Sequence, residues 1–289
     1  MQFDVIMAIH NRVSTKMFHD AFLDEPKKEA LENYINTVGT GPFRSNIKFY
    51  LVDIGGFPKK ELQMLNLSKD IHHAYAYIVG TVLSSEEYNL EDYGYIFEKI
   101  VLFATSLKLG TCWLSLKSNQ NRFVELIGAK DFELIPCISP VGLPSDYLEH
   151  NYASTDYSKL SESKTRKAKQ LLFFVNQFSN PIQSDCSSQY LYAMEMVRLA
   201  PSIKNMQPWR IVYDPISRVY HFYMEHSLHE LYLPQCEQVI DLQRVDMGAA
   251  MYHFEATLQH FGIEGKWKII DPRYPLPNKK TEYIATWTP

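Results

Sequence analysis

Three short segments carry polar side chains at spacings that could serve a chemical purpose. The first has Arg12, Ser14 and Lys16 at alternate positions, with Phe18 two residues further on. If this segment is extended, alternate side chains project to one face, so two cations and a hydroxyl converge there. Such a set can bind an anion through charge-assisted hydrogen bonds. The pattern also fits a solvated N-terminal strand whose cations point into water.

The second segment runs from Ala200 to Trp209 and follows a predicted helix. Pro201 should end that helix, and Pro208 should restrict Gln207 to an extended conformation. Three side chains suited to hydrogen bonding lie between the two prolines: Ser202, Asn205 and Gln207. The segment is therefore expected to form a rigid polar loop. An ordinary helix-to-strand connection with Trp209 in the core is the alternative.

The third segment, Leu107 to Ser115, is where a predicted helix ends at Gly110 and a strand-like run begins. A junction of this kind can present backbone N–H and C=O groups to a planar ligand. It also fits a plain helix-to-strand connection with Trp113 buried. None of the three segments decides the function alone.

Bulk properties exclude several classes of protein. The chain has 289 residues, a net charge of −4 and a sequence pI of about 6.2, and its cations form no stripe, so nucleic acid is not an expected partner. The four cysteines form no C-x-x-C pair, so no metal site or short-range disulfide framework is expected. The sequence contains no Gly-x-Gly-x-x-Gly motif, so a Rossmann domain is not predicted.

Two apolar stretches bear on localisation. Met1 to His10 has no long apolar run after a basic start, which argues against a secretory signal. Ile100 to Leu116 is interrupted by Lys108 and is shorter than the roughly 20 residues that a membrane span needs. We therefore expect a soluble cytoplasmic protein with no membrane partner.

Hydrophobic periodicity predicts a mixture of helices and strands that must position these segments. Helices are expected near Lys27–Val38, Tyr93–Leu109, Asn121–Ile127, Arg166–Phe174, Ser187–Leu199 and Val245–Phe261. Strands are expected at Ile47–Asp53, Ala76–Val82, Cys137–Gly142, Arg210–Asp214, Val219–Met224, Trp267–Ile270 and Tyr283–Trp287. The polar stretch Leu148 to Glu162 is expected to be a linker or surface excursion.

A weak internal repeat runs through these elements. The strand at Phe49–Asp53 resembles Arg210–Asp214, which sets Lys48 opposite Trp209. Trp113 then follows Lys48 by 65 residues, and Trp267 follows Trp209 by 58. Two diverged copies of one α+β unit explain these intervals most simply, although chance similarity between two such stretches is the alternative.

Taken together, the segments resemble the nitroreductase family of flavoproteins. That family opens with an R-R-S-x-R-x-F-like segment, carries an A-P-S-x-x-N-x-Q-P-W loop, and later has a G-L-G-T-C-W-like helix end, a G-Y-P turn and a basic tail. The corresponding residues here are Arg12–Phe18, Ala200–Trp209, Lys108–Trp113, Gly142-Leu143-Pro144 and Lys164-Thr165-Arg166. The Ala200–Trp209 match is the most specific.

The order of the motifs departs from the family's usual pattern. The proline-serine loop ordinarily follows soon after the first segment, but here it comes some 185 residues later. Family members are homodimers with FMN at the interface, so the resemblance implies two halves joined in one chain. The implied fold is α+β and nitroreductase-like: two diverged α/β units form a pseudo-dimer, with central antiparallel or mixed sheets flanked by helices. The expected divisions are half one at 1–147, linker and basic tail at 148–177, and half two at 178–289.

The resemblance also implies roles for individual residues. Arg12, Ser14, Lys164 and Arg166 would hold the phosphate and ribityl end of FMN, and Lys16 would lie near the pyrimidine edge. The Trp113-Leu114-Ser115 backbone would run beside the ring edge carrying N5, with the Trp113 ring directed into the core. From the other half, four residues would lie along the isoalloxazine: Pro201, Ser202, Ile203 and Asn205.

One FMN per chain is expected, because the positions that would form the second, mirror-related site of the pseudo-dimer lack the required groups. Leu172, Phe174 and Asn176 stand where Arg12, Ser14 and Lys16 would be, and Gly41 to Asn46 replaces the proline-serine loop. The chain is expected to be a monomer, since the pseudo-dimer is internal.

The implied activity is ping-pong hydride transfer from NAD(P)H through FMN to a nitroaromatic, quinone or similar acceptor. This scheme needs no catalytic acid or base from the chain, and no metal. Other flavin chemistry, such as flavin fragmentation or dehalogenation, and non-catalytic flavin binding are the alternatives, because fold and cofactor do not fix the substrate.

Overall fold

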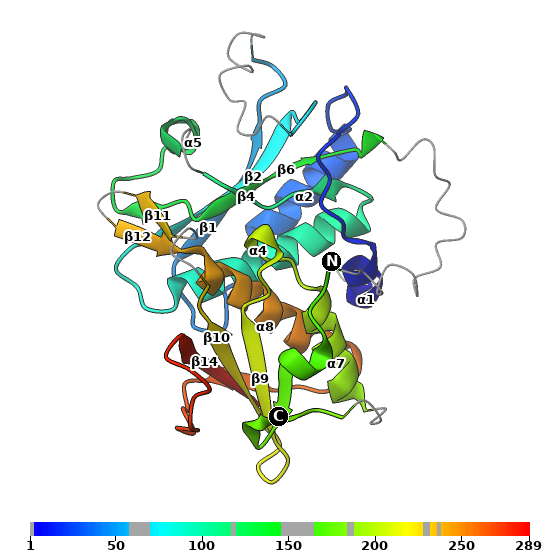
Figure 1. Ribbon diagram of the computed structural model, residues 1–289. Helices are drawn as coiled ribbons and strands as arrows, with labels where there is room; N and C mark the ends of the chain where they lie inside the picture. Colours follow the sequence, from blue (N-terminus) through cyan, green and yellow to red (C-terminus); the bar gives the residue numbers. More distant parts are fainter. Residues whose placement is uncertain are drawn as a thin grey trace.

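Two six-stranded sheets lie on opposite sides of a central pair of helices (Figure 1). The computed structural model describes residues 3–57, 70–116, 120–145, 165–183, 188–227, 232–235 and 238–289. Its main helices are α1 (Val5–Asn11), α2 (Glu25–Thr37), α4 (Asn89–Ser106), α5 (Gln120–Ile127), α7 (Gln189–Leu199) and α8 (Leu242–His260). Two short 3-10 helices are η3 (Lys169–Leu171) and η4 (Ile203–Asn205).

The first sheet has the order β1-β2-β6-β3, with every neighbouring pair antiparallel. Its strands are β1 (Ile47–Asp53), β2 (Ala76–Leu83), β6 (Cys137–Gly142) and β3 (Gly110–Thr111), with β4 (Leu114–Ser115) on β6 and β5 (Glu133–Leu134) on β2. The central strand β6 is buried along its whole length, and β2 along all but its last residue. This burial explains why both strands are continuous apolar runs rather than alternating ones.

The second sheet repeats this order with its own four strands, β9-β10-β14-β13, which correspond to β1-β2-β6-β3 and are again antiparallel. These strands are β9 (Trp209–Asp214), β10 (Val219–Glu225), β14 (Thr281–Thr288) and β13 (Lys266–Lys268). Two further strands extend it beyond β9: β7 (Phe173–Val175), which is parallel to β9, and β8 (Gln177–Pro181). A separate ribbon pairs β11 (Tyr232–Gln235) with β12 (Gln238–Asp241).

The helices α4 and α8 cross at two glycines, one on each helix. A Cβ atom on Gly94 would lie 1.9 Å from the Val245 carbonyl oxygen, and one on Gly248 would lie 1.9 Å from the Glu91 carbonyl oxygen. Since neither distance leaves room for a methyl group, the two helix backbones can approach this closely only with glycine at both positions. The contact is reciprocal: each glycine touches the other helix's backbone.

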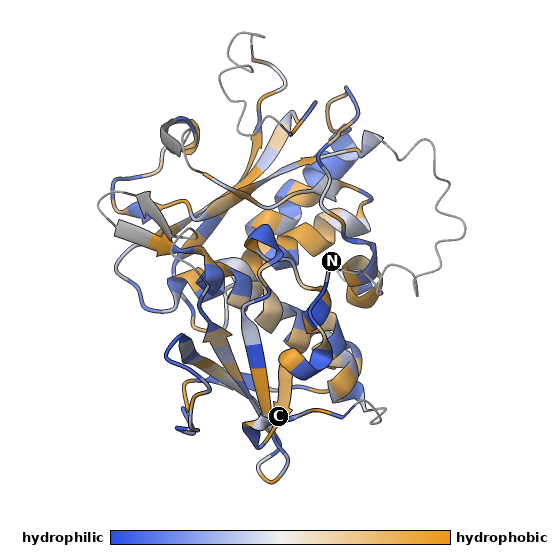
Figure 2. Ribbon diagram, in the orientation of Figure 1, coloured by the Kyte–Doolittle hydropathy of each residue, from blue (hydrophilic) through white to orange (hydrophobic). Residues whose placement is uncertain are grey.

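The core of each half takes in residues from the other half. Ile203, which precedes β9, belongs to the core cluster around β2 and α4, whereas Phe43, which precedes β1, packs against the cluster around β10 and α8. Hydrophobic colours run along α4, which lies between the two sheets (Figure 2). Burial of these apolar faces on both sides of the helix pair is the main stabilising contribution to the fold.

The predicted α+β class and nitroreductase-like fold are confirmed, and most predicted elements are present. The helix expected at Arg166–Phe174 is wrong, because that stretch forms the 3-10 turn η3 and the start of strand β7. Pairing of β7 with β9 satisfies its backbone groups and buries Phe173, an arrangement that the apolar pattern does not distinguish from a helix. The short helix α1 and the strands β5, β7, β8, β11 and β12 were not predicted, whereas β3 and β4 lie in the strand-like run expected within Leu107–Ser115.

Within the described residues, no helix has the length and apolar character needed to cross a membrane.

Candidate functional site

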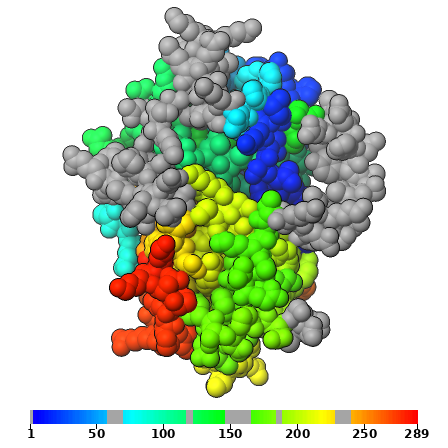
Figure 3. Space-filling view, in the orientation of Figure 1, coloured from blue at the N-terminus to red at the C-terminus, as the bar shows by residue number. Residues whose placement is uncertain are grey.

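A cavity of about 750 Å³ lies where the N-terminal segment meets the residues that follow 165. Figure 3 shows these two parts of the chain, dark blue and light green, next to each other on one face of the molecule. The cavity is lined by residues from four separate stretches: Ile9, His10, Arg12, Val13, Ser14, Lys16, Cys112, Trp113, Leu114, Ser115, Thr165, Arg166, Leu199, Pro201, Ser202, Ile203, Lys204 and Asn205. Eleven of the twelve predicted site residues are among them; the twelfth, Lys164, lies outside the described residues.

The first wall is the extended segment that follows α1. Asp4 caps α1 by accepting from the Met7 N–H, and the chain leaves the helix at Arg12 with ψ of 118°. Ser14 then forms a β-bridge with Thr111, and the Thr15 N–H donates to the Thr111 carbonyl at 2.8 Å. This close approach requires Gly110, because a Cβ there would lie 2.5 Å from the Thr15 hydroxyl.

The two cations of this segment differ in exposure. The Arg12 side chain is 8% exposed, and its Nε is 3.9 Å from the Glu98 carboxylate. The Lys16 side chain is 56% exposed and its Nζ is 3.6 Å from Asp70. Arg12 Nε is buried and donates no hydrogen bond to any residue that the structure describes. A buried guanidinium nitrogen without an acceptor is costly, so an anion bound in the cavity would stabilise it.

The second wall is the segment from Cys112 to Ser115. The Trp113 indole N–H donates to Glu98 Oε2 at 3.2 Å, and its ring packs edge-on against Phe97 at 4.9 Å between centroids. The ring therefore belongs to the core, while the backbone continues into β4 at the cavity. The expectation that the helix ends at Gly110 is wrong: α4 ends at Ser106, and Lys108, with φ of 62°, takes the left-handed position.

The third wall is the loop from Pro201 to Asn205, which follows the last turn of α7. Asp246 on α8 holds this loop by accepting from the Ile203 N–H at 3.0 Å. The Ser202 hydroxyl accepts from the Gln207 N–H at 2.9 Å. Lys204 and Asn205 both have positive φ, of 52° and 57°. A loop held in such sparsely populated conformations depends on these contacts, which fix its shape before any ligand binds.

Gln207 is not extended, contrary to the expectation from Pro208. Its φ is 49°, and its side chain is almost fully buried. The amide compensates for this conformation with several hydrogen bonds: its Oε1 accepts from the Lys167 N–H at 2.8 Å, and its Nε2 donates to the carbonyls of Thr165 and Asn205. Gln207 therefore ties the basic tail to the loop and does not itself line the cavity.

Arg166 joins the tail to the end of α7. Its guanidinium donates to the carbonyls of Leu199 and Ala200 at 2.9 and 2.8 Å, and to the Asn205 side-chain oxygen at 3.0 Å. Burial, followed by repulsion from Arg12 and Arg198, lowers the pKa of Arg166 to about 10. Three of its five N–H groups are thus occupied within the protein, and the rest of the guanidinium borders the cavity.

The lining of this cavity is electropositive. Arg12, Lys16, Arg166 and Lys204 are among its lining residues, which include no aspartate or glutamate. A group with a flat apolar body and an anionic end suits this lining, because apolar residues such as Val13, Leu114 and Ile203 stand beside the cations. The donors present therefore fit a phosphate-bearing aromatic cofactor.

Two features of the site gave no clear sequence signal. Glu98 and His253 lie directly beneath the cavity wall, yet each is only one of several polar residues in its helix. Lining residues such as Thr165 and Lys204 flank predicted positions but follow from the fold alone. The one sequence signal for Glu98 is its place within Tyr95–Ala104, a largely apolar stretch of α4.

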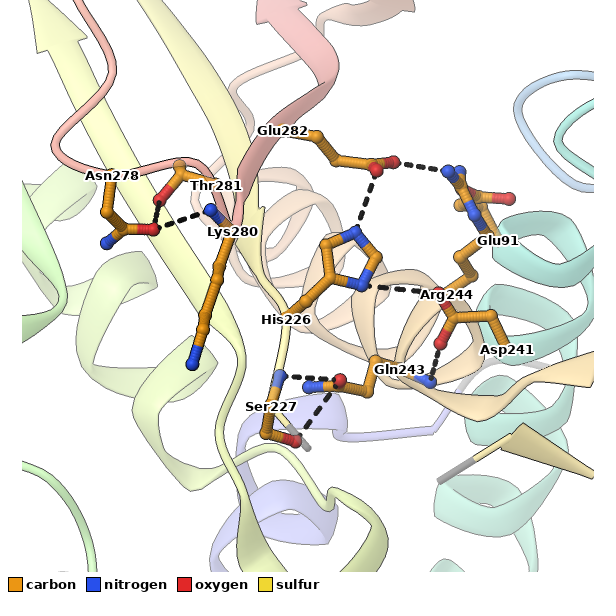
Figure 4. Close-up of polar contacts among 10 residues, drawn as sticks. All are labelled: Glu91, His226, Ser227, Asp241, Gln243, Arg244, Asn278, Lys280, Thr281 and Glu282. Atoms are coloured by element: carbon orange, nitrogen blue, oxygen red, sulfur yellow. Dashed lines mark hydrogen bonds and ion pairs between the residues drawn. The ribbon is translucent and has the colours of Figure 1, made fainter. Parts of the chain in front are cut away.

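A second polar cluster lies at the start of α8 and is shown in Figure 4. Arg244 pairs with Glu91 at 2.6 Å and with Glu282, and His226 Nε2 lies 2.7 Å from Glu282. The His226 Nδ1 lies 3.5 Å from Asp241. Because the two ring nitrogens face different carboxylates, these groups do not converge on one point. The cluster instead joins α4, α8, β12, β14 and the residue that follows β10.

An electropositive cavity between two sheet-and-helix units, in this arrangement of sheets, defines the nitroreductase class of oxidoreductases. The chain belongs to the family described as "Putative TM nitroreductase", whose model matches residues 4–258. Proteins of this family are generally flavin-dependent.

Solved structures include matches over both the full chain and about half of it. A "putative nitroreductase" from Thermotoga maritima is 20% identical with a TM-score of 0.58, and the match covers 99% of this chain and 94% of that one. A nitroreductase family protein from Clostridium novyi NT is 22% identical over 52% of this chain and 89% of its own, with a TM-score of 0.38. An FMN-dependent nitroreductase from Clostridium difficile R20291 is 21% identical over 53% and 96%, with a TM-score of 0.39. No curated protein matches.

Proposed function

We propose that the protein binds one FMN and transfers hydride from NAD(P)H to a nitroaromatic, quinone or similar acceptor. The observation that carries the proposal is the electropositive cavity, because eleven residues expected from sequence to contact FMN line it. They come from both halves of the chain, and they bring cations, hydroxyls and backbone edges to one place. FMN, when bound, supplies the hydride-accepting ring.

The residues would divide the cofactor between them. Arg12, Ser14 and Arg166, with Lys164, would bind the phosphate and ribityl end through charge-assisted hydrogen bonds. Lys16 would lie near the pyrimidine edge, where a positive charge favours the anionic reduced ring and raises the reduction potential. The backbone of Trp113–Ser115 would face the edge carrying N5, and the Pro201–Asn205 loop would lie along the ring.

The chain's own chemical task in this proposal is binding and orientation. No lining side chain needs to act as an acid or base, since protons can come from water. Nicotinamide and acceptor would occupy the open part of the cavity in turn, which gives ping-pong kinetics. Other flavin reactions and non-catalytic flavin binding remain the competing functions on the same scaffold.

The proposal of one FMN per chain rests on the residues that stand where the second, mirror-related FMN site of the pseudo-dimer would be. Leu172 and Phe174, which correspond to Arg12 and Ser14, are buried apolar residues: Leu172 lies in the core around β10 and α8, and Phe174 in a smaller cluster beside it. Phe43 occupies the position that Ile203 has in the proline-serine loop and packs into the same core. We therefore propose an internal duplication, with divisions at 1–147, 148–177 and 178–289, that retains one site and acts as a cytoplasmic monomer.

Absorbance of purified protein after FMN addition, with a flavin count and a molar mass, tests the proposal. We expect a yellow protein with one FMN per 33.6-kDa chain. No bound flavin would refute the cofactor, and two flavins would refute the single site. Steady NAD(P)H consumption with a nitro compound or quinone separates a reductase from a flavin-binding protein that does not turn over.

A further inference from the structure

Beneath the cavity, a glutamate and a histidine form a fully buried pair between the two halves. Glu98 lies on α4 and His253 on α8, and both side chains are 0% exposed. Glu98 Oε1 is 2.9 Å from His253 Nε2 and 3.9 Å from Arg12 Nε. Its other oxygen accepts from the Trp113 indole. One carboxylate thus contacts groups from two walls of the cavity.

The second nitrogen of His253 faces a backbone carbonyl. His253 Nδ1 is 2.8 Å from the Met196 carbonyl oxygen in the last turn of α7. The Ala200 N–H, which would complete a helical bond to Met196, donates to Val197 instead. Because a carbonyl only accepts, Nδ1 must carry a proton.

The proton between Nε2 and Glu98 therefore decides the charge of the pair. With Nδ1 protonated, the pair is either a neutral imidazole with a protonated carboxyl group, or an imidazolium with a carboxylate. Three contacts favour the ionised form: Arg12 near Oε1, the Trp113 N–H on Oε2, and the negative end of the α7 dipole at Nδ1. The other titratable groups close to Glu98 are Arg166, Tyr252 and Cys137.

We propose that His253 is a positioning residue of the cofactor site, which keeps the charge of Arg12 available for the FMN phosphate by neutralising Glu98. With an imidazolium present, Glu98, His253 and Arg12 together carry one positive charge. Without it, Glu98 cancels Arg12, and the cluster presents no net charge to an anion. This inference rests on the proposed function, because the anion it names is FMN.

Charge compensation predicts that a second substitution restores binding. His253→Gln leaves Glu98 opposite Arg12, so FMN should bind about tenfold or more weakly, as expected for one unit charge acting at this depth. The double variant Glu98→Gln/His253→Gln removes both charges and leaves Arg12 positive, so its Kd should return most of the way to that of wild type. A purely structural role for His253 predicts that the double variant binds no better than the single one.

The measurement is an FMN titration of the full chain, followed by quenching of flavin fluorescence. His221→Gln is the matched control, since His221 is also a buried histidine but bonds Thr286 between β10 and β14. It should bind FMN as wild type does. If His253→Gln also binds like wild type, or if the double variant is not restored, the inference is wrong.

Nitrogen NMR of the wild-type protein tests the charge of His253 without flavin or any variant. Both ring nitrogens should carry a proton, as the contacts of His253 imply; a neutral imidazole would overturn the inference even if His253→Gln failed to fold. Failure of the proposed function has a different signature, because the wild-type protein would then bind no FMN at all.

Discussion

The loops that precede β1 and β9 are built alike but differ in what holds them. In each, an aspartate on the central helix accepts from the loop backbone: Asp92 from the Phe43 N–H at 2.9 Å, and Asp246 from the Ile203 N–H at 3.0 Å. The residue that follows is a left-handed cation in both loops, Arg44 with φ of 64° and Lys204 with φ of 52°. Asp92 and Asp246 are 154 residues apart, as are Gly94 and Gly248, and Trp113 and Trp267.

The two loops differ in the hydrogen bonds of the second aspartate oxygen and in the segment of the chain that packs beside each loop. Asp92 Oδ2 accepts from the Ser45 N–H at 2.8 Å, whereas Asp246 Oδ2 is buried with no hydrogen bond from the described residues. The second loop is instead held from outside, by Arg166 and Lys167. One scaffold thus gives a self-contained loop in one half and, in the other, a loop completed by the tail that forms the cavity wall.

The largest expected effect comes from breaking the glycine crossing that both halves share. Gly94→Ala or Gly248→Ala places a methyl group against backbone oxygen, so each should lower the free energy of unfolding by about 3 kcal/mol. Urea unfolding measures this. Gly56→Ala, which meets open space, is the control and should change stability by less than about 0.5 kcal/mol. Equal effects at Gly56 and Gly94 would refute the role of the crossing.

The second-largest effect is expected from the asymmetry between the proposed FMN site and the matching place in the other half. Arg12→Ala should weaken FMN binding by about 2 kcal/mol, or roughly thirtyfold, through loss of charge-assisted hydrogen bonds. Asn176→Gly, at the position matching Lys16 and with φ of 63°, should leave FMN binding unchanged. Fluorescence titration compares the two variants. Equal weakening by both would mean that the halves have been assigned the wrong way round.

A smaller effect is expected from the aspartates under the loops. Asp92→Asn replaces an oxygen that accepts from Ser45 with an amide that cannot, and should cost about 1–2 kcal/mol of stability. Asp246→Asn keeps an oxygen for Ile203 and loses no second bond, so it should cost less. The difference between the two values in urea unfolding is the quantity of interest, and a larger cost at Asp246 would contradict the comparison.

The smallest effect is a pH dependence of the same Asp246 variant. Burial raises the pKa of Asp246 well above its ordinary value. The folded state therefore binds this proton more tightly than the unfolded state, and the associated stability is lost as pH rises above the ordinary aspartate pKa towards the raised one. Asp246→Asn has no such group, so its stability relative to wild type should improve between pH 5 and pH 8. A constant difference would show that Asp246 does not titrate in this way.

Sequence patterns located the strands better than the turns. Ile47–Asp53 and Cys137–Gly142 were predicted to the residue, because strand burial leaves a direct trace in apolar runs. The left-handed conformation of Gln207 could not be predicted, since it depends on hydrogen bonds from a distant segment. Lys108 is left-handed at the last turn of α4, where the Lys108 and Leu109 N–H groups donate to Thr105 and Ala104. Likewise, the motif residues of the cavity follow from the family resemblance, but the Glu98–His253 pair beneath it follows only from how α4 packs on α8.

The basic tail at Arg166 and Lys167 packs on the second half of the chain, and this packing affects how the cavity responds to dilution. Arg166 and Lys167 contact the second half's loop, and β7 then adds to the second half's sheet. In a site built from two separate chains, the walls part when the protein is diluted below its dissociation constant. Here the walls are covalently connected, so their effective concentration is set by chain geometry and not by the amount of protein. Retention of a ligand should therefore be governed by the ligand's own concentration, even at nanomolar protein.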